Sequence, residues 1–347
     1  MKEISKILLD WYSANKRELP WRETTDPYRI WISEIILQQT RIVQGYEYFL
    51  KFIERFPNVQ ELAKADEDEV LKYWQGLGYY SRARNLHIAA KSIANRETFP
   101  VTYEEVRSLK GVGDYTAAAI CSIAYGLPYA VVDGNVYRVI SRLFGIDTPI
   151  DSGKGKKLFA ELAQSIMCKY SPGIYNQAIM DFGAIQCTPQ KPLCHQCPLA
   201  EKCYAYHYSK QNTLPVKQHH TKIKKRYFNY IDVHAGIYTF INKREKDDIW
   251  KNLYELPLIE TTEEIDEATF YSLPEFQALI KTNEKPLLRC VCKGIKHILS
   301  HRIIYANFYE VILPEDTSSF SSYQRIKRID LDSYPVSRLV NLYFEKK

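Results

Sequence analysis

Apolar residues recur with helical spacing through the first two-thirds of the chain, and few long alternating runs interrupt them. Asp26 and Pro27 are typical of an N-cap followed by proline at the first helical position. Residues 28–37 are apolar on most faces, which predicts a buried helix. Similar patterns predict helices at 43–56, 66–75, 81–95, 103–108, 115–125, 134–144, 154–169 and 173–185.

The pattern changes to a period of two after residue 228. Tyr230–Ile241 and Arg302–Leu313 alternate apolar and polar residues as strands do, whereas 263–282 and 334–345 have helical spacing. The polar, basic stretch before them is either a solvated linker or a segment that touches phosphate. We therefore expect a mainly helical domain over 1–214, a basic linker over 215–228 and an α+β domain over 229–347.

The composition is that of a globular protein with a basic surplus: 347 residues, 46% of them hydrophobic, and a net charge of +6. The surplus permits binding to nucleic acid, although many basic proteins bind none. No run of about 18 apolar residues is present, and the N-terminus lacks the apolar core of a signal peptide. We expect a cytoplasmic protein without membrane contact, whose eight cysteines are thiols or metal ligands rather than disulfides.

Four cysteines fall within one short segment, with the spacing C-x6-C-x2-C-x5-C. They are Cys187, Cys194, Cys197 and Cys203. Soft thiolates at this spacing close short chelate loops and suit an iron–sulfur cluster or zinc. Structural zinc usually takes two close pairs, so the single C-x2-C favours iron–sulfur, with zinc or metal-free thiols as alternatives. The other four, Cys121, Cys168, Cys290 and Cys292, are expected to be ordinary buried thiols.

A glycine-rich turn, Gly111-Val112-Gly113, joins two predicted helices, the first of which begins with a capping box at Thr102 and Glu105. Such glycines let the backbone turn tightly and leave amide groups bare at the start of the next helix. Those amides can bind a phosphate without reading sequence. A plain turn between two helices would have the same pattern.

Asp133 lies where a later helix should begin, in Val131-Val132-Asp133-Gly134-Asn135. An N-cap explains most aspartates at such positions. The functional alternative is a carboxylate aimed at a developing positive charge, and both roles coexist only if one oxygen stays free.

Together, these motifs over residues 15–203 resemble the helix-hairpin-helix, iron–sulfur DNA glycosylases. Further segments are similar to the MutY family of adenine glycosylases, which also has a Nudix-like C-terminal domain: Leu19–Arg22, Trp31–Glu34 with Leu37–Thr40, and Gly76–Arg82. The related endonuclease III has a lysine nucleophile two residues after the second hairpin glycine, where this chain has Tyr115. The resemblance therefore implies a monofunctional hydrolase whose strand-cutting activity is absent or weak.

The resemblance implies base excision repair, with removal of adenine mispaired with 8-oxoguanine or guanine in double-stranded DNA. Glu34 would then be the acid that protonates adenine, and Asp133 the carboxylate that stabilises the sugar cation or briefly bonds to it. Tyr115 and Asn135 match positions near the intermediate. Taken without the family, Glu34 fits a buried salt-bridge partner better. The cofactor implied for residues 187–203 is a [4Fe-4S] cluster.

The adenine must leave the base stack before its bond to the sugar is cut. By resemblance, its pocket is formed by Arg17, Leu19, Trp21, Arg22 and Gln177. Gln39 and either Tyr79 or Tyr80 match residues that wedge into the duplex. The stretch from Leu19 to Trp21 is equally compatible with a core anchor. A metal cation beside a phosphate, held by the carbonyls of Arg107, Leu109 and Val112, is a further expectation.

Leu299, Ser300 and His301 stand where the family has a Phe-Ser-His loop that recognises 8-oxoguanine. Leucine can still wedge, but it stacks less well than an aromatic ring. A strand-edge loop without a ligand is the alternative. The clustered glutamates of Nudix hydrolases are missing, so we expect this domain to recognise a base rather than hydrolyse a nucleotide. We also expect a monomer associated with the nucleoid.

Two other functions compete with this interpretation. One is an endonuclease III-like enzyme for oxidised pyrimidines, which Tyr115 and the extra domain oppose. The other is an iron–sulfur DNA-binding protein without catalysis, which the presence of both Glu34 and Asp133 opposes.

Overall fold

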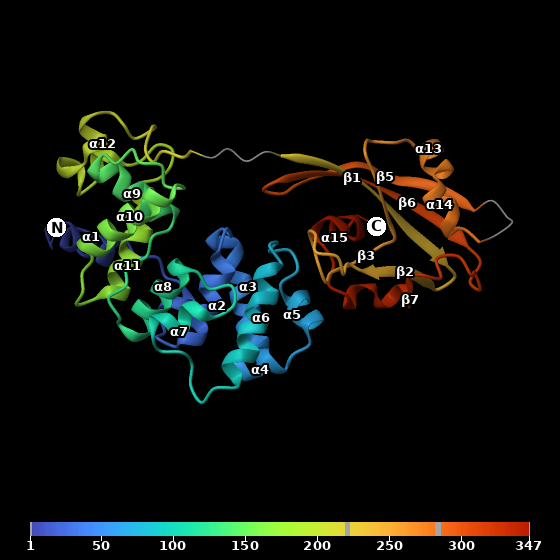
Figure 1. Ribbon diagram of the computed structural model, residues 1–347, viewed down its shortest axis with the longest axis horizontal. Helices are drawn as coiled ribbons and strands as arrows, with labels where there is room; N and C mark the ends of the chain where they lie inside the picture. Colours follow the sequence, from blue (N-terminus) through green and yellow to red (C-terminus); the bar gives the residue numbers. More distant parts are fainter. Residues whose placement is uncertain (1, 219–222, 282–285, 347) are drawn as a thin grey trace. The chain divides into compact units, whose positions relative to one another are not determined.

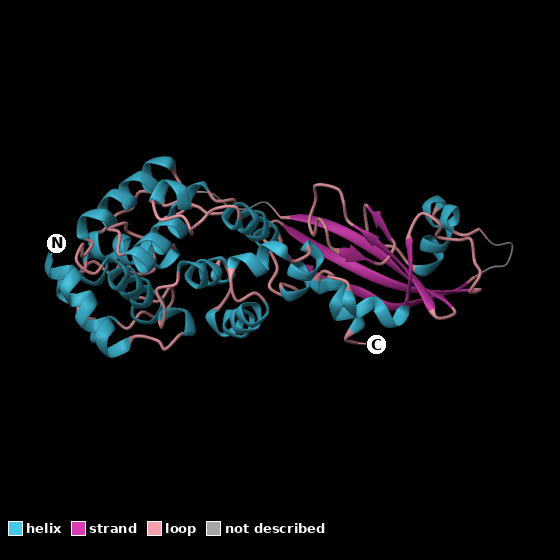
Figure 2. Ribbon diagram, turned by 90° about the horizontal axis from the view of Figure 1, so that it is seen from below, coloured by secondary structure: helices cyan, strands magenta, loops and turns pink. Residues whose placement is uncertain are grey.

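The computed structural model describes residues 2–218, 223–281 and 286–346. The chain forms two compact units, Met1–Lys64 with Asn85–His219, and Ala65–Arg84 with His220–Lys347. Helices build the first unit, and the strands of the described residues belong to the second (Figures 1 and 2). The predicted combination of a mainly helical region and an α+β domain is therefore confirmed. Among the described residues, no helix combines the length and the apolar character needed to cross a membrane.

The first unit packs its helices around a core that includes Val136, Ile140, Phe159 and Ile179. Most predicted helices are present with small shifts at their ends. The helices are α1 (Lys2–Asn15), α2 (Pro27–Leu37), α3 (Ile42–Arg55), α4 (Val59–Lys64), α6 (Ser81–Ala94, whose first residues belong to the second unit), α7 (Tyr103–Ser108), α8 (Asp114–Tyr125), α9 (Gly134–Phe144), α10 (Gly153–Ile166), α11 (Pro172–Asp181) and α12 (Tyr204–His207), with short turns η1 (Pro20–Arg22), η2 (Phe182–Gln186), η3 (Cys194–Gln196) and η4 (Ala200–Lys202).

The second unit is a mixed sheet in the order β3-β2-β1-β6-β5, with β4 paired to β1 and β7 paired to β2. β1 and β6 run parallel, and β5 and β6 form an antiparallel hairpin. The strands are β1 (Lys224–Ala235), β2 (Tyr238–Lys243), β3 (Tyr254–Glu255), β4 (Leu258–Thr261), β5 (Leu287–Ile298), β6 (Arg302–Leu313) and β7 (Gln324–Lys327), accompanied by α5 (Glu67–Tyr73), α13 (Glu267–Ser272), α14 (Pro274–Leu279), η5 (Arg328–Ser333) and α15 (Arg338–Phe344).

Helices cover both faces of this sheet. Tyr309 of β6 stacks on Phe270 of α13, with ring centroids 3.9 Å apart. Its neighbour Phe308 stacks on Tyr343 of α15 at 4.2 Å. Because successive residues of a strand point to opposite faces, α13 and α15 lie on opposite sides of the sheet.

Several predicted elements of the second unit are wrong in detail. The predicted strand Tyr230–Ile241 contains a turn at Gly236, whose φ of 60° ends β1 before β2 begins. The predicted helix 263–282 is two short helices as far as residue 281, because Pro274 disfavours helical backbone at the residue before it, and residue 282 lies outside the described residues. The helix expected over 334–345 begins only at Arg338, and β5 was not predicted.

The domain boundaries also differ from those expected. β1 begins at Lys224, so the end of the predicted linker 215–228 is strand, and residues 219–222 lie outside the described residues. The segment Ala65–Arg84 groups with the second unit although it was placed in 1–214. Its contacts explain the grouping: Asp68 pairs with Lys243 at 2.6 Å, and its other carboxylate oxygen accepts from Tyr254 at 3.0 Å. Of the four cysteines expected to be buried, only Cys121 is, whereas Cys168, Cys290 and Cys292 are partly exposed.

Candidate active site

A cavity of about 190 Å³ in the first unit brings together nine of the predicted site residues. It lies among η1, α2, α8, α9 and α11, which are far apart in the sequence. The nine are Arg17, Leu19, Trp21, Arg22, Glu34, Tyr115, Asp133, Asn135 and Gln177. Sequence reasoning missed the apolar part of the wall, where Ile30, Leu37, Ile42, Ile123 and Met180 carry no chemical signal of their own.

Glu34 lies in the middle of α2, among residues that are nearly all buried. Its side chain opens into the cavity, yet the residue is only 8% exposed. Burial raises the pKa of its carboxyl to about 7; the negative charge of Asp133 adds to this rise, while a hydrogen bond from Tyr115 and the positive charge of Arg22 oppose it. A carboxyl with this pKa is about half protonated near neutral pH, as a general acid requires.

Asp133 caps the N-terminus of α9, as the sequence predicts. Its Oδ1 accepts from the backbone amide of Val136 at 2.8 Å, and its Oδ2 accepts from the side-chain amide of Asn135 at 2.8 Å. Neither oxygen is therefore wholly free. The expectation from the sequence is that Asp133 can both cap the helix and act in catalysis only if one oxygen stays free. The backbone amide of Asn135 also donates to this carboxylate, which has about four lone-pair positions, so the three hydrogen bonds leave one acceptor position. Burial raises the pKa of Asp133 above its ordinary value, although these hydrogen bonds and the charge of Arg138 oppose the rise.

Tyr115 lies in the first turn of α8 and is partly buried. Its hydroxyl, which is hydrogen-bonded to the Glu34 carboxyl, also lies 3.2 Å from the Met180 sulfur. Burial and the charges of Glu34 and Asp133 hold the pKa of the phenol well above its usual value. The side chain is therefore a neutral hydrogen-bond donor beside the two carboxyls.

Asp181, which the sequence did not single out, organises the other side of the cavity. It is fully buried and forms two hydrogen bonds with Arg22, at 2.7 and 2.8 Å, and an ion pair with Arg17. Burial raises the pKa of Asp181, but hydrogen bonds from Arg22 and Arg17 outweigh it and lower the pKa below the usual range. Both predicted pocket arginines are thus fixed by one carboxylate. The one sequence signal that could have identified Asp181 is its position on α11, one turn after Gln177, which places both residues on the same face of the helix.

The remaining predicted pocket residues combine cavity and core roles. Leu19 and Trp21 are buried, and Trp21 meets Phe49 edge to face, so the core-anchor alternative is also satisfied. The Oε1 of Gln177 accepts from Tyr12 at 2.8 Å, which fixes the orientation of its amide.

A chain of hydrogen bonds leads from Asp133 to the cysteine segment. Asn135, which donates to Asp133, accepts from Arg138 at 2.8 Å. Arg138 is buried and also donates to the carbonyls of Cys187 at 2.7 Å and Gly183 at 2.6 Å. The position of the catalytic candidate therefore depends on the backbone that carries the first cysteine.

The four clustered cysteines line one cavity. They are Cys187, Cys194, Cys197 and Cys203, brought together by η3, η4 and the ends of the flanking helices. The Arg142 guanidinium lies 3.4 Å from the Cys187 sulfur and donates to the carbonyls of Thr188 and Pro189. Burial raises the pKa of the Cys197 thiol to about 11, so a positively charged metal centre is needed to keep it as a thiolate. The residues fit an iron–sulfur cluster.

The glycine turn joins α7 and α8 as predicted, and Thr102 and Glu105 form the capping box. Gly111 has a φ of 83° and lies so close to Asn85 that a Cβ would come within 2.8 Å of it. Gly111, Gly113 and Gln39 line an open groove of about 920 Å³ that Glu34 and Asp133 also line, whereas Val112 is buried beneath it.

The carbonyls expected to hold a cation already accept hydrogen bonds in two of three cases. The Leu109 oxygen accepts from the Val112 amide, and the Val112 oxygen accepts from the Arg107 guanidinium. A cation there would compete with a positively charged side chain, and this site stays a prediction.

In the second unit, two of the residues predicted to contact DNA, Tyr79 and Ser300, lie next to each other. The β5–β6 turn carries Leu299, Ser300 and His301, and the Ser300 hydroxyl is hydrogen-bonded to that of Tyr79. Tyr79 is 46% exposed, with a φ of 48°. Tyr80 is buried, and its hydroxyl donates to the Val336 carbonyl. Of the two tyrosines, Tyr79 is the one placed to reach a ligand.

Comparison with known proteins agrees with this geometry. Residues 32–165 match the HhH-GPD superfamily of base excision DNA repair proteins, 187–203 the iron–sulfur binding domain of endonuclease III, and 232–346 the NUDIX domain. An adenine DNA glycosylase of Buchnera aphidicola subsp. Schizaphis graminum is 36% identical over 261 residues, covering 74% of this chain and 75% of that protein. The chain belongs to the adenine DNA glycosylase family.

Other relatives extend the comparison. The adenine DNA glycosylase of Homo sapiens is 42% identical over 209 residues, covering 57% of this chain and 38% of that protein. A thermostable thymine-DNA glycosylase of known structure superposes with a TM-score of 0.56 and 31% identity, covering 60% of this chain and 96% of that one. The chain is therefore a DNA N-glycosylase, and its four clustered cysteines bind a [4Fe-4S] cluster.

Proposed function

We propose that this enzyme removes adenine opposite 8-oxoguanine or guanine in double-stranded DNA, as a monofunctional and monomeric glycosylase. The observation that carries the proposal is the pairing of Glu34, with a pKa of about 7, and Asp133 on the wall of one cavity. Cleavage of an N-glycosidic bond needs an acid for the leaving base and a carboxylate for the sugar cation. The two side chains supply these groups.

In the proposed reaction, Glu34 transfers its proton to N7 of the adenine. The bond between C1′ and N9 then breaks, and its electron pair leaves with the base. Asp133 stabilises the resulting sugar cation or bonds to it briefly. Water adds to C1′ and returns a proton to Glu34. Asn135 holds the Asp133 carboxylate in place for this step.

The flipped adenine would enter the cavity beside Leu19, Trp21 and Arg22. Arg17 and Gln177 would face its polar edge. The Val112 amide already donates to the Leu109 carbonyl, so Gly111 and Gly113 are the members of this turn that would bind a phosphate at the start of α8. Gln39 would enter the gap that the base leaves. Neutral Tyr115 has no amine for a Schiff base, which supports hydrolysis without strand cleavage.

We further propose that the second unit recognises 8-oxoguanine. The exposed Ser300 and Tyr79 hydroxyls offer hydrogen bonds to the oxidised base, and the Tyr79 ring offers a stacking surface. Leu299 would wedge beside the base and His301 would contact a phosphate. Association with the nucleoid would follow from such DNA binding.

A single-turnover assay on four duplexes tests the proposal. The duplexes carry adenine opposite 8-oxoguanine, guanine or thymine, or an oxidised pyrimidine opposite guanine, and each is analysed with and without alkali. We expect breaks only after alkali, and only in the first two. Cleavage of the oxidised pyrimidine without alkali would instead identify an endonuclease III-like enzyme. DNA binding without any cleavage would identify a non-catalytic binder.

A further inference from the structure

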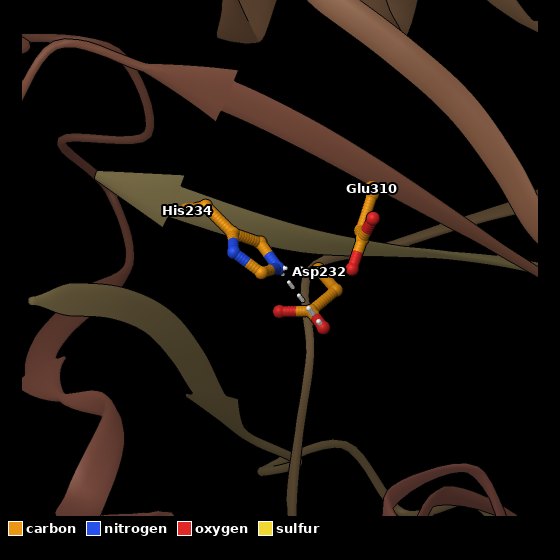
Figure 3. A group of neighbouring side chains, drawn as sticks. All are labelled: Asp232, His234 and Glu310. Carbon is orange, nitrogen blue, oxygen red and sulfur yellow. Dashed lines mark ion pairs between the residues drawn. The ribbon is translucent and has the colours of Figure 1, made fainter. Parts of the chain in front are cut away.

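Three side chains of the second unit gather on one face of the sheet (Figure 3). It is the face that α15 covers, because Tyr343 of α15 is hydrogen-bonded to one of them, Asp232. Asp232 and His234 are alternate residues of β1, so they point to the same face. Glu310 of the parallel strand β6 is the register partner of Asp232, which places its carboxylate on that face as well. None of the three takes part in the proposed reaction, and the grouping needs an explanation of its own.

The distances within this group are close to those between two ligands of one metal ion. Nε2 of His234 lies 3.2 Å from Oε1 of Glu310 and 3.6 Å from Oδ2 of Asp232. Hydrogen bonds between a protonated histidine and a carboxylate are shorter, at about 2.7–2.9 Å. Two ligands that each lie about 2.1 Å from a tetrahedral zinc ion are roughly 3.4 Å apart. All three candidate ligand atoms lie within 4.8 Å of one another.

Neighbouring side chains hold the group as they hold ligands in metal sites. The Tyr343 hydroxyl of α15 donates to Oδ2 of Asp232 at 2.8 Å, and Arg328 donates to Oδ1 at 3.0 Å. Tyr343 is itself fixed by its stacking on Phe308. Such outer contacts orient a ligand without occupying every lone pair.

Charge and access also suit a cation. The two carboxylates supply negative charge for a doubly charged ion, and Arg328 pairs with one of them, Asp232. The Asp232 side chain is 1% exposed, whereas those of His234 and Glu310 are 30% and 22% exposed. The buried ligand lies on the inside, and the two others face solvent, from which an ion and a completing water can enter.

We propose that Asp232, His234 and Glu310 form a binding site for zinc, separate from the cysteine cluster. The nitrogen ligand favours zinc over magnesium, which prefers an all-oxygen octahedron. The ion would join β1 to β6 and, through Asp232 and Tyr343, to α15. It is a structural ion that takes no part in base excision.

Zinc titration of the full-length protein, with its iron–sulfur cluster intact, tests this site. Zinc affinity is measured by competition with a chromophoric chelator, with magnesium as the comparison ion. We expect one zinc per chain, and at least ten-fold weaker binding by His234→Gln and by Glu310→Gln. Asp316→Asn, which removes an exposed charge from the same unit, is the matched control and should bind zinc normally.

X-ray absorption at the zinc edge then identifies the ligands. Nitrogen and oxygen neighbours alone are expected, whereas sulfur neighbours would mean that zinc had entered the cysteine site. Circular dichroism and iron content show whether each variant is folded. If one of the two single variants fails to fold, the other still tests the site. Equal zinc binding by the unmodified protein and both folded variants, sulfur neighbours, or no binding would each overturn the proposal.

Discussion

The raised pKa of Glu34 predicts how the rate of adenine excision depends on pH. If Glu34 must be protonated to donate to the base, the rate follows the protonated fraction of a group with a pKa of about 7. That fraction is about 90% at pH 6 and about 10% at pH 8. We therefore expect the single-turnover rate to fall roughly ten-fold between these two values and to keep falling at higher pH. An ordinary glutamate would be ionised throughout this range.

The assay is single-turnover excision of adenine opposite 8-oxoguanine at saturating enzyme, with ionic strength held constant and DNA binding measured at each pH. The acidic side of the profile depends on the ionisation of Asp133, which must be negatively charged to stabilise the sugar cation. Because burial raises the pKa of Asp133, the rate should begin to fall on acidification at a higher pH than it would with an exposed aspartate. A rate that is flat from pH 6 to pH 8.5 under saturating conditions would refute the role of Glu34 as the acid.

The same shift predicts an effect on stability. Moving the pKa from 4.5 to about 7 corresponds to about 3 kcal/mol. Because the folded state keeps the proton longer than the unfolded state, stability falls as pH rises from 4.5 to about 7, and the full cost remains above that. Glu34→Gln should therefore abolish excision yet raise the melting temperature, more at pH 8 than at pH 5. An equal change in melting temperature at both pH values would contradict a raised pKa for the buried Glu34 carboxyl.

Three further substitutions test other parts of the site. Gly111→Ala places a Cβ against Asn85 at positive φ, which costs about 1–2 kcal/mol and should weaken duplex binding irrespective of sequence, as a gel-shift assay would detect. Arg138→Ala leaves buried carbonyls without a donor, at about 1–3 kcal/mol each, so iron content and excision rate should fall together. Asp181→Asn frees the two pocket arginines and should slow excision at least ten-fold, about 1.4 kcal/mol, with iron content unchanged.

The sequence predicted the helical unit well because its signals are local. The N-cap at Asp26 and the capping box at Thr102 depend on residues a few positions apart, and the structure confirms both. The sheet was harder to predict, because its register depends on contacts between distant strands. β5 has irregular register around Cys292, and the turn at Gly236 interrupts an otherwise regular alternation.

The candidate site shows the same division between local and distant information. The cysteines are predictable from spacing, whereas the pocket residues were found through family resemblance, since no local pattern relates Arg17 to Gln177. Asp181 was missed because its two partners lie about 160 residues earlier, at separations of 164 and 159. The exposure that distinguishes Tyr79 from Tyr80 depends on contacts of the second unit, which adjacent residues cannot reveal.

Direct detection of the released base tests the central claim most simply. The enzyme is incubated with a duplex that has adenine opposite 8-oxoguanine, and free bases are identified by mass spectrometry without alkali or heat. We expect free adenine equal to the enzyme-bound duplex, with both strands intact, and almost none from a folded Asp133→Asn variant that still binds the duplex. Release of any other base, or full adenine release by Asp133→Asn, would contradict the account.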